Sequence, residues 1–191
     1  RVLFRSDLHL PTNYLVTPPV ITNTMSELFV KEGMKQYAIS ETQKYGHVTY
    51  FWNGNRSGKV SETLETYKEI PSDNISFDLK PWMKSAEISE EVIKAMETKE
   101  YQFIRVNYPN GDMVGHTAIM EAATKATEVV DECVGRVFKK VEEKGGVMII
   151  TADHGNADMC IDENGRPFTP HTKNPVPCEK KKKGLNLIPQ G

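Results

Sequence analysis

Residues 103–151 read FIRVNYPNGDMVGHTAIMEAATKATEVVDECVGRVFKKVEEKGGVMIIT, and this stretch decides the fold class. It starts with an apolar segment over residues 103–108 that is typical of a β-strand. Apolar side chains then recur at steps of three and four residues, which is the one-sided pattern of an amphipathic helix. They are Ile119, Ala122, Ala126, Val129, Val130, Cys133, Val137 and Val141.

The helix and its two flanking segments predict a βαβ unit. Gly145 and Gly146 end the helix, and residues 147–151 form a nearly continuous apolar run. Such a run is typical of a strand buried on both faces of a parallel sheet. A strand, a crossover helix and a second strand make up a βαβ unit. We therefore predict an α/β fold with a mostly parallel sheet and helices on both faces.

The rest of the chain predicts further helices and strands. Thr24 and Glu27 form a capping-box pattern, which predicts a helix that Gly33 ends. Residues 37–40 and 47–52 predict two strands. Residues 89–96 predict a short helix with acidic side chains in its first turn, where they interact favourably with the helix dipole.

Length and composition exclude several classes of protein. At roughly 150 residues per domain, 191 residues correspond to one domain or slightly more. The 24 basic and 26 acidic residues give a net charge of −2, so we expect no nucleic-acid partner. The sequence has no apolar run near the roughly 20 residues of a membrane span, and no signal-peptide pattern at its start. Three cysteines without a CxxC pair favour a reducing, cytoplasmic compartment, with Cys133 buried and inert.

Two loops with metal-ligand chemistry directly follow the strands at residues 103–108 and 147–151. One carries Asp112 and His116, and the other carries Asp153 and His154. Because ligands bind outside the carboxyl ends of strands in open α/β sheets, we expect both loops to face one crevice. Mixed carboxylate and imidazole ligands suit manganese, zinc or iron. His171, in Pro170-His171-Thr172, completes the set; each fragment alone also fits an ordinary turn or a core histidine.

Five stretches resemble one enzyme family over residues 8–177. The chain is similar to the phosphatase domain of cofactor-independent (2,3-bisphosphoglycerate-independent) phosphoglycerate mutases of the plant and protist type, which are dimanganese enzymes of the alkaline phosphatase superfamily. The resemblance implies an alkaline-phosphatase-like fold, here incomplete, and leaves residues 178–191 as an irregular basic tail. The stretches are residues 10–19, 40–58, 107–116, 147–158 and 171–177.

The resemblance also implies a role for each candidate site residue. Asp112, His116 and His171 would hold one metal ion. Asp153 and His154 would hold a second ion, together with an aspartate and a nucleophilic serine from the family's N-terminal part. We expect two Mn²⁺ ions, with Mg²⁺, Co²⁺ or Zn²⁺ as alternatives. Lys44 matches the lysine that contacts the transferring phosphoryl group; its alternative is a solvated loop lysine.

The implied activity is the glycolytic interconversion of 3-phosphoglycerate and 2-phosphoglycerate through a phosphoserine intermediate. The enzyme would be an isomerase with a phosphoglycerate substrate, no membrane partner and, when full length, a monomeric state. The family's Ser-Glu-Val-Gly-His segment does not occur in this sequence. We therefore expect a fragment that lacks the nucleophile and is inactive by itself, with a tail that is either native or a frameshift.

Two other functions fit the same motifs. One is a hydrolase of the same superfamily that transfers phosphate or sulfate to water. The other is a non-catalytic, metal-binding fragment that pairs with another polypeptide.

Overall fold

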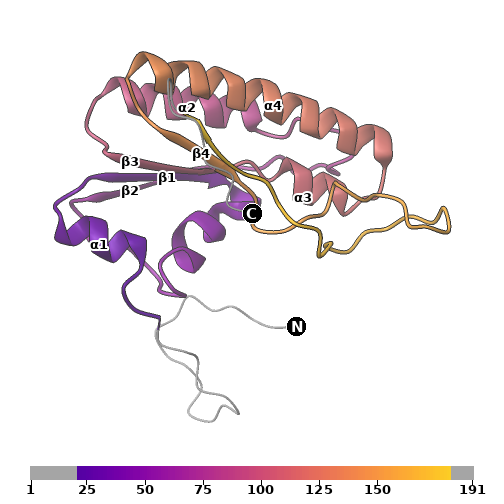
Figure 1. The fold of residues 1–191 in the computed structure, drawn as a ribbon, viewed down its shortest axis with the longest axis horizontal. Coiled ribbons are helices and arrows are strands. Elements are labelled where there is room, and N and C mark those ends of the chain that lie inside the picture. Colours follow the sequence, from indigo (N-terminus) through magenta and orange to yellow (C-terminus); the bar gives the residue numbers. More distant parts are fainter. Residues whose placement is uncertain (1–20, 182–191) are drawn as a thin grey trace, which may run out of the picture.

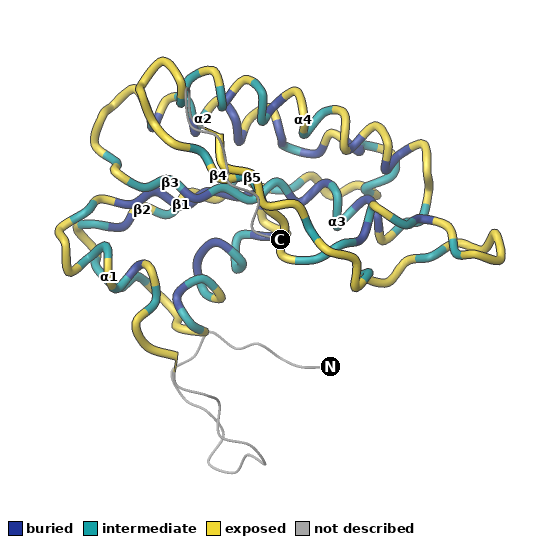
Figure 2. Tube along the Cα trace, in the orientation of Figure 1, coloured by how far each residue is buried: buried dark blue, intermediate teal, exposed yellow. Residues whose placement is uncertain are grey.

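A three-stranded parallel sheet forms the centre of the computed structural model, which describes residues 21–181. Its strands are β1 (Gln36–Glu41), β2 (Glu65–Ile70) and β3 (Phe103–Asn107), in the order β2-β1-β3. Gln36 lies opposite Glu65 on one side and Phe103 on the other. Every residue of the central strand β1 is buried (Figure 2). The structure thus confirms a mixed α/β fold with a parallel sheet.

Helices cover both faces of this sheet (Figure 1). Helices α2 (Ser85–Glu97) and α4 (Met120–Glu143) lie on one face, and α1 (Met25–Lys31) lies on the other. The main core lies between the sheet and α2 and α4, and its fully buried side chains include Ile39, Ile88 and Val92. The helix α3 (Asn110–Gly115) directly follows β3 and packs against α4.

Local sequence signals account for the two best-predicted helices. The hydroxyl of Thr24 accepts a hydrogen bond from the Glu27 backbone N–H, and the Glu27 carboxylate accepts one from the Thr24 backbone N–H. This is the predicted capping box of α1. In α4 the apolar stripe buries Ala122, Ala126, Cys133 and Val137, as the three- and four-residue spacing predicts.

The prediction of a strand at residues 47–52 is wrong. Residues His47–Phe51 form a helical turn, η2, after the short 3₁₀ helix η1 (Thr42–Lys44). β-branched and aromatic side chains favour strands only where a neighbouring strand is available to pair with them. Here the backbone turns out of the sheet after β1, and Arg105 Nε donates to the Val48 carbonyl at 2.7 Å. Strand β2, with the polar sequence ETYKEI at the edge of the sheet, was not predicted.

The last strand also differs from the prediction. Strand β4 (Met148–Thr151) does not join the parallel sheet; it pairs antiparallel with β5 (Cys178–Lys181). It is half-buried on one face and exposed on the other, since Met148 packs on the core whereas Ile149 is 65% exposed. The predicted βαβ unit is therefore not completed within the described residues.

The strand β5 corrects the expectation of an irregular tail from residue 178. Its four side chains are exposed, as expected for a charged segment, but its backbone pairs with β4 (Figure 2). Residues 10–19 and the end of the tail, residues 182–191, lie outside the described residues. No helix in the described part of the chain has the length and apolar character needed to cross a membrane.

Candidate metal centre

The predicted site residues come from four segments that meet beyond the carboxyl ends of the strands. Lys44 lies in η1, directly after β1. Asp112 lies in α3, directly after β3, and His116 is the residue that caps this helix. Asp153 and His154 follow β4, and His171 lies in the long loop before β5. The chain ends of parallel strands share one edge of a sheet, which is why the first two segments converge.

One oxygen of Asp112 lies among the Nε2 atoms of three histidines. Asp112 Oδ1 is 3.2 Å from His116 Nε2, 3.0 Å from His171 Nε2 and 3.8 Å from His154 Nε2. The Nε2 atoms of His116 and His171 are 3.1 Å apart. Ligands about 2.0–2.1 Å from a tetrahedral ion lie about 3.3 Å from one another. The Asp112, His116 and His171 atoms therefore have nearly the spacing that a small divalent ion requires.

The second expected pair of ligands belongs to the same cluster. The His154 ring stacks on the His171 ring, with centroids 3.6 Å apart. The Nε2 atom of His154 lies 3.6 Å from Asp153 Oδ1. Asp112, His154 and His171 each offer a ligand atom within 4.8 Å of the others. Asp112, His116, His154 and His171 thus lie together, and Asp153 adjoins them through its contact with His154. Asp112 and His171 lie close to expected ligands of both ions.

Lys44 is buried in this cluster, which contradicts the alternative of a solvated loop lysine. Its side chain is 8% exposed, and its Nζ lies 2.6 Å from Asp112 Oδ2. Burial by itself would raise the pKa of Asp112. The hydrogen bond and positive charge of Lys44, with smaller contributions from His116 and His154, outweigh burial and lower this pKa below its usual value. Asp112 is therefore ionised and ready to bind a cation.

Backbone carbonyls and loop contacts orient the histidines. The Nδ1 atom of His116 lies 2.7 Å from the Thr169 carbonyl, so this nitrogen donates a hydrogen bond to the carbonyl, and Nε2 is the ring atom that faces Asp112. Thr172, next to His171, donates its backbone N–H to the Gly155 carbonyl at 2.9 Å. These bonds attach the loop of His171 to the loop of His154.

Asp158 strengthens that attachment, and sequence reasoning missed it. Its Oδ2 accepts hydrogen bonds from Thr172 Oγ1 at 2.9 Å and from Asn174 Nδ2 at 2.6 Å. These two bonds lower the pKa of Asp158, the Asn174 bond most, against the raising effect of burial. Its position four residues after His154 carries no signal for this role, because the partner lies in a different loop.

Sequence reasoning also missed the residues that join the Lys44 segment to the Asp112 helix. The buried Glu41 carboxylate accepts a hydrogen bond from the Lys84 backbone N–H at 3.1 Å, just before α2. The buried Asn110, the first residue of α3, accepts from Ser85 Oγ at 2.7 Å and donates to the Pro81 carbonyl at 2.8 Å. The start of α2 thus connects the two segments that bring Lys44 and Asp112 together.

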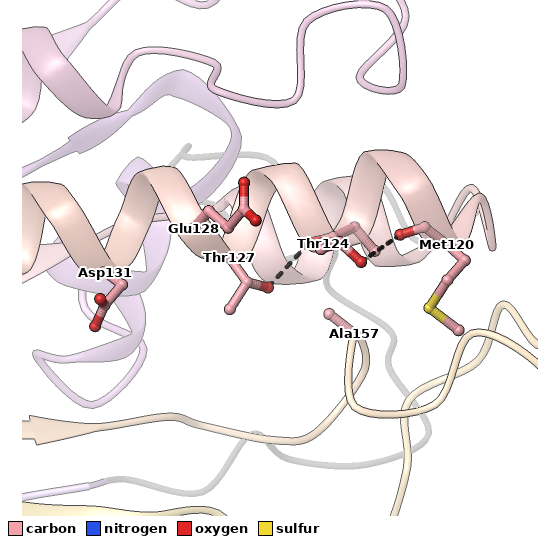
Figure 3. A pocket seen from close by; sticks show the side chains of 7 residues that line it. Met120, Thr124, Thr127, Glu128, Asp131 and Ala157 are labelled. Atoms are coloured by element: carbon pink, nitrogen blue, oxygen red, sulfur yellow. Dashed lines mark hydrogen bonds between the residues drawn. The ribbon is translucent and has the colours of Figure 1, made fainter.

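A surface cavity lies apart from the predicted ligands. It is formed between one face of α4 and the loop at Ala157 (Figure 3). Its lining includes Met120, Thr124 and Thr127 but none of the predicted site residues. The predicted ligands therefore do not line this cavity.

Comparison with known proteins agrees with the motifs. Residues 6–187 match the metalloenzyme superfamily. The chain is 48% identical to the 2,3-bisphosphoglycerate-independent phosphoglycerate mutase of Trypanosoma brucei brucei, over 91% of this chain and 34% of that protein. It is 46% identical to the Zea mays protein of the same name, over 91% of this chain and 34% of that protein. These similarities confirm the resemblance that the five stretches predicted.

Solved structures give the same result. A crystal structure of Leishmania mexicana phosphoglycerate mutase, determined at low cobalt concentration, has a TM-score of 0.87 and 46% identity. It covers 92% of this chain, which covers 34% of that structure. A Pyrococcus horikoshii protein with a TM-score of 0.54 and 16% identity shares the fold alone. The chain spans about a third of the length of the phosphoglycerate mutases it matches.

Proposed function

The chain belongs to the metalloenzyme superfamily, and from this premise we propose that it is the metal-binding part of a cofactor-independent phosphoglycerate mutase. Its activity would be the interconversion of 3-phosphoglycerate and 2-phosphoglycerate through a phosphoserine intermediate, in the cytoplasm. The observation that carries this proposal is the position of Asp112. One of its oxygens faces three histidine Nε2 atoms and the other faces a buried lysine.

The donor set fits a pair of divalent ions. Asp112, His116 and His171 would hold one ion, and Asp153 and His154 would supply ligands to the second. Mn²⁺ is the expected metal, since carboxylate and imidazole ligands suit it. When bound, two such ions neutralise charge on a phosphoryl group and activate a hydroxyl nucleophile.

Lys44 would hold the substrate's phosphoryl group. Its ammonium already lies at the edge of the ligand cluster, 2.6 Å from Asp112 Oδ2. A compact cation in this position can donate a hydrogen bond to a phosphoryl oxygen. Because Lys44 is buried, water competes little for that bond, and its electrostatic effect is correspondingly large.

A Mn²⁺ titration of the 191-residue chain by isothermal calorimetry tests the metal assignment. We expect one tighter site and one weaker site, because Asp153 and His154 provide fewer ligands than Asp112, His116 and His171. Asp112→Ala should abolish the tighter site. Asp131→Ala, an exposed aspartate on α4, is the matched control and should leave both sites unchanged.

Two results would contradict the assignment. Two equally tight sites would mean that the ligands are divided differently. Retention of the tighter site in both Asp112→Ala and His171→Ala would show that these residues do not form the metal site.

A further inference from the structure

Asn156 is a buried amide placed against two of the proposed metal ligands. It is 4% exposed, and it lies in the loop that follows His154. Its Nδ2 atom is 3.2 Å from Asp112 Oδ1 and 3.3 Å from His116 Nδ1. No role was assigned to it from the sequence.

The carboxylate of Asp112 sets the orientation of this amide. Turned the other way, the amide oxygen would face the carboxylate oxygen, and the two acceptors would repel each other. His116 Nδ1 gives its proton to the Thr169 carbonyl at 2.7 Å, so it is not the acceptor. The hydrogen bond of Asn156 is therefore made to Asp112, which strengthens it because the acceptor is charged.

The other end of the amide is held without a hydrogen bond. Asn156 Oδ1 is fully buried and has no partner among the described residues. A buried acceptor without a partner destabilises a fold, so the Oδ1 end of the side chain does not account for an asparagine here. The residue is explained by what its Nδ2 atom does at Asp112.

A glycine in α3 makes room for the amide. A Cβ atom added at Gly115 would lie 2.1 Å from Asn156 Oδ1. Gly111, in the same helix, has no atom within 4 Å of the corresponding position. The missing side chain at Gly115 thus leaves the room that the Asn156 amide fills, whereas the same position at Gly111 faces open space.

We propose that Asn156 is a positioning residue of the metal centre, an inference that rests on the proposed function. Lys44 holds Asp112 Oδ2 and Asn156 holds Oδ1, so the plane of the carboxylate is fixed with Oδ1 facing the histidines. Groups that hold a metal ligand in this way affect metal affinity although they do not touch the metal.

Calorimetric Mn²⁺ titration of the 191-residue chain tests this inference. Asn156→Ala and the similarly sized Asn156→Leu should each weaken the tighter site by about 10- to 100-fold. Gly115→Ala should weaken it as well, by displacing the amide, and should have a much smaller effect in the Asn156→Ala background, where the Ala157 backbone N is 3.1 Å from the added Cβ. Asn164→Ala, an exposed asparagine in the turn at residues 162–165, and Gly111→Ala are the matched controls, and neither should change the affinity.

An affinity for Mn²⁺ within about twofold of the parent in both Asn156 variants would overturn the inference, because loss of a group that holds a metal ligand lowers the affinity by more than this. Loss of affinity in Asn156→Ala alone, with Asn156→Leu unaffected, would also overturn it, since packing rather than the donor would then be responsible.

A measurement without metal separates this inference from the proposed function. The side-chain NH₂ signals of Asn156, identified in a ¹⁵N–¹H spectrum as the pair missing from Asn156→Ala, should shift in Asp112→Ala and not in Asp131→Ala. Unshifted signals in Asp112→Ala would overturn the inference. Failure of the parent chain to bind Mn²⁺ would instead overturn the proposed function, and the NH₂ signals would still report the hydrogen bond.

Discussion

The ammonium of Lys44 and the carboxylate of Asp112 lie 2.6 Å apart, and the lysine is nearly inaccessible to solvent. Such a pair fixes the positions of both side chains. It leaves Lys44 Nζ beside the histidine cluster, where a phosphoryl oxygen would bind. His47, whose pKa is lowered by burial and then by the charge of Lys44, is half-buried nearby.

We predict that Lys44→Ala weakens phosphate binding much more than metal binding. With Mn²⁺ saturating, the variant should bind inorganic phosphate about tenfold less tightly, since a charge-assisted hydrogen bond is lost. Its Mn²⁺ affinity should change little, because removal of a positive charge next to the cation site offsets the loss of the contact that holds Asp112 Oδ2. Calorimetry with each ligand in turn measures both effects.

Lys59→Ala is the control for this prediction. Lys59 lies outside the cluster and pairs with Glu62 on the surface. Equal phosphate affinities in Lys44→Ala and the parent chain would mean that Lys44 only neutralises Asp112.

Arg105 joins three elements beneath the site. From β3 it donates to Gln36 Oε1 in β1 at 3.0 Å, and its Nη2 lies 3.2 Å from Glu65 Oε1 in β2. Its Nε donates to the Val48 carbonyl of η2 at 2.7 Å. Both charged side chains of the Arg105–Glu65 pair are almost fully buried. This network holds the helical turn that follows Lys44 against the sheet.

Glu65→Gln should therefore destabilise the chain by about 3 kcal/mol at neutral pH, since it leaves the buried Arg105 without a charged partner. Urea unfolding measures the change. Glu62→Gln, whose side chain is 80% exposed, should change stability by less than about 0.5 kcal/mol. A similar small loss in Glu65→Gln would show that the network is not required for the fold.

The Arg105–Glu65 pair contributes to the stability of the fold in a way that depends on pH. Burial raises the pKa of Glu65, but the Val60 backbone N–H, Arg105 and further hydrogen bonds outweigh it and lower the pKa below its usual 4.5. A carboxyl group whose pKa is lowered by folding stabilises the fold at pH values above its pKa in the unfolded chain. This stabilisation is lost as the pH falls through its pKa in the folded chain. The stability difference between the parent and Glu65→Gln should thus be constant from pH 7 to about 5 and shrink below about 4.5. A stability difference that grows as the pH falls would contradict this prediction.

At the scale of the whole molecule, the described residues assemble a metal-ligand cluster that serine and threonine hydroxyls do not contact by hydrogen bonds. Within residues 21–181, no serine or threonine hydroxyl is hydrogen-bonded to Lys44, Asp112 or the three histidines of the cluster. The proposed reaction needs a hydroxyl that attacks the phosphoryl group, and loss of such a nucleophile typically costs about a millionfold in rate.

We therefore predict that the 191-residue chain alone does not interconvert the two phosphoglycerates. A chimera with the remaining two thirds of the Trypanosoma brucei brucei relative should do so, and Lys44→Ala in the chimera should reduce turnover by about 10²–10³-fold. ³¹P NMR distinguishes 3-phosphoglycerate from 2-phosphoglycerate directly. Sustained interconversion by the chain alone would show that a nucleophile lies elsewhere in it.

Local patterns in the sequence determined the elements whose stability is mostly local. The helical stripe of α4 and the capping box at Thr24 each depend on neighbours within a few residues. The meeting of Asp112 with Asp153 and His154 was also predicted, but from a shared sheet edge, whereas β4 pairs with β5 outside the parallel sheet. The motifs added His171, whose loop carries no periodic signal of its own.

Only the tertiary structure decided the elements and side chains whose partners are distant in sequence. Residues 47–51 have the composition of a strand, but their backbone turns away from the sheet and is held by Arg105. Strand β4 has the composition of a buried strand, but it pairs with β5 and keeps one face exposed. The donors at Asn156 and Asp158 act on residues of other loops. Short-range propensity carries no information about these contacts, because their energy comes from groups that only the folded chain brings together.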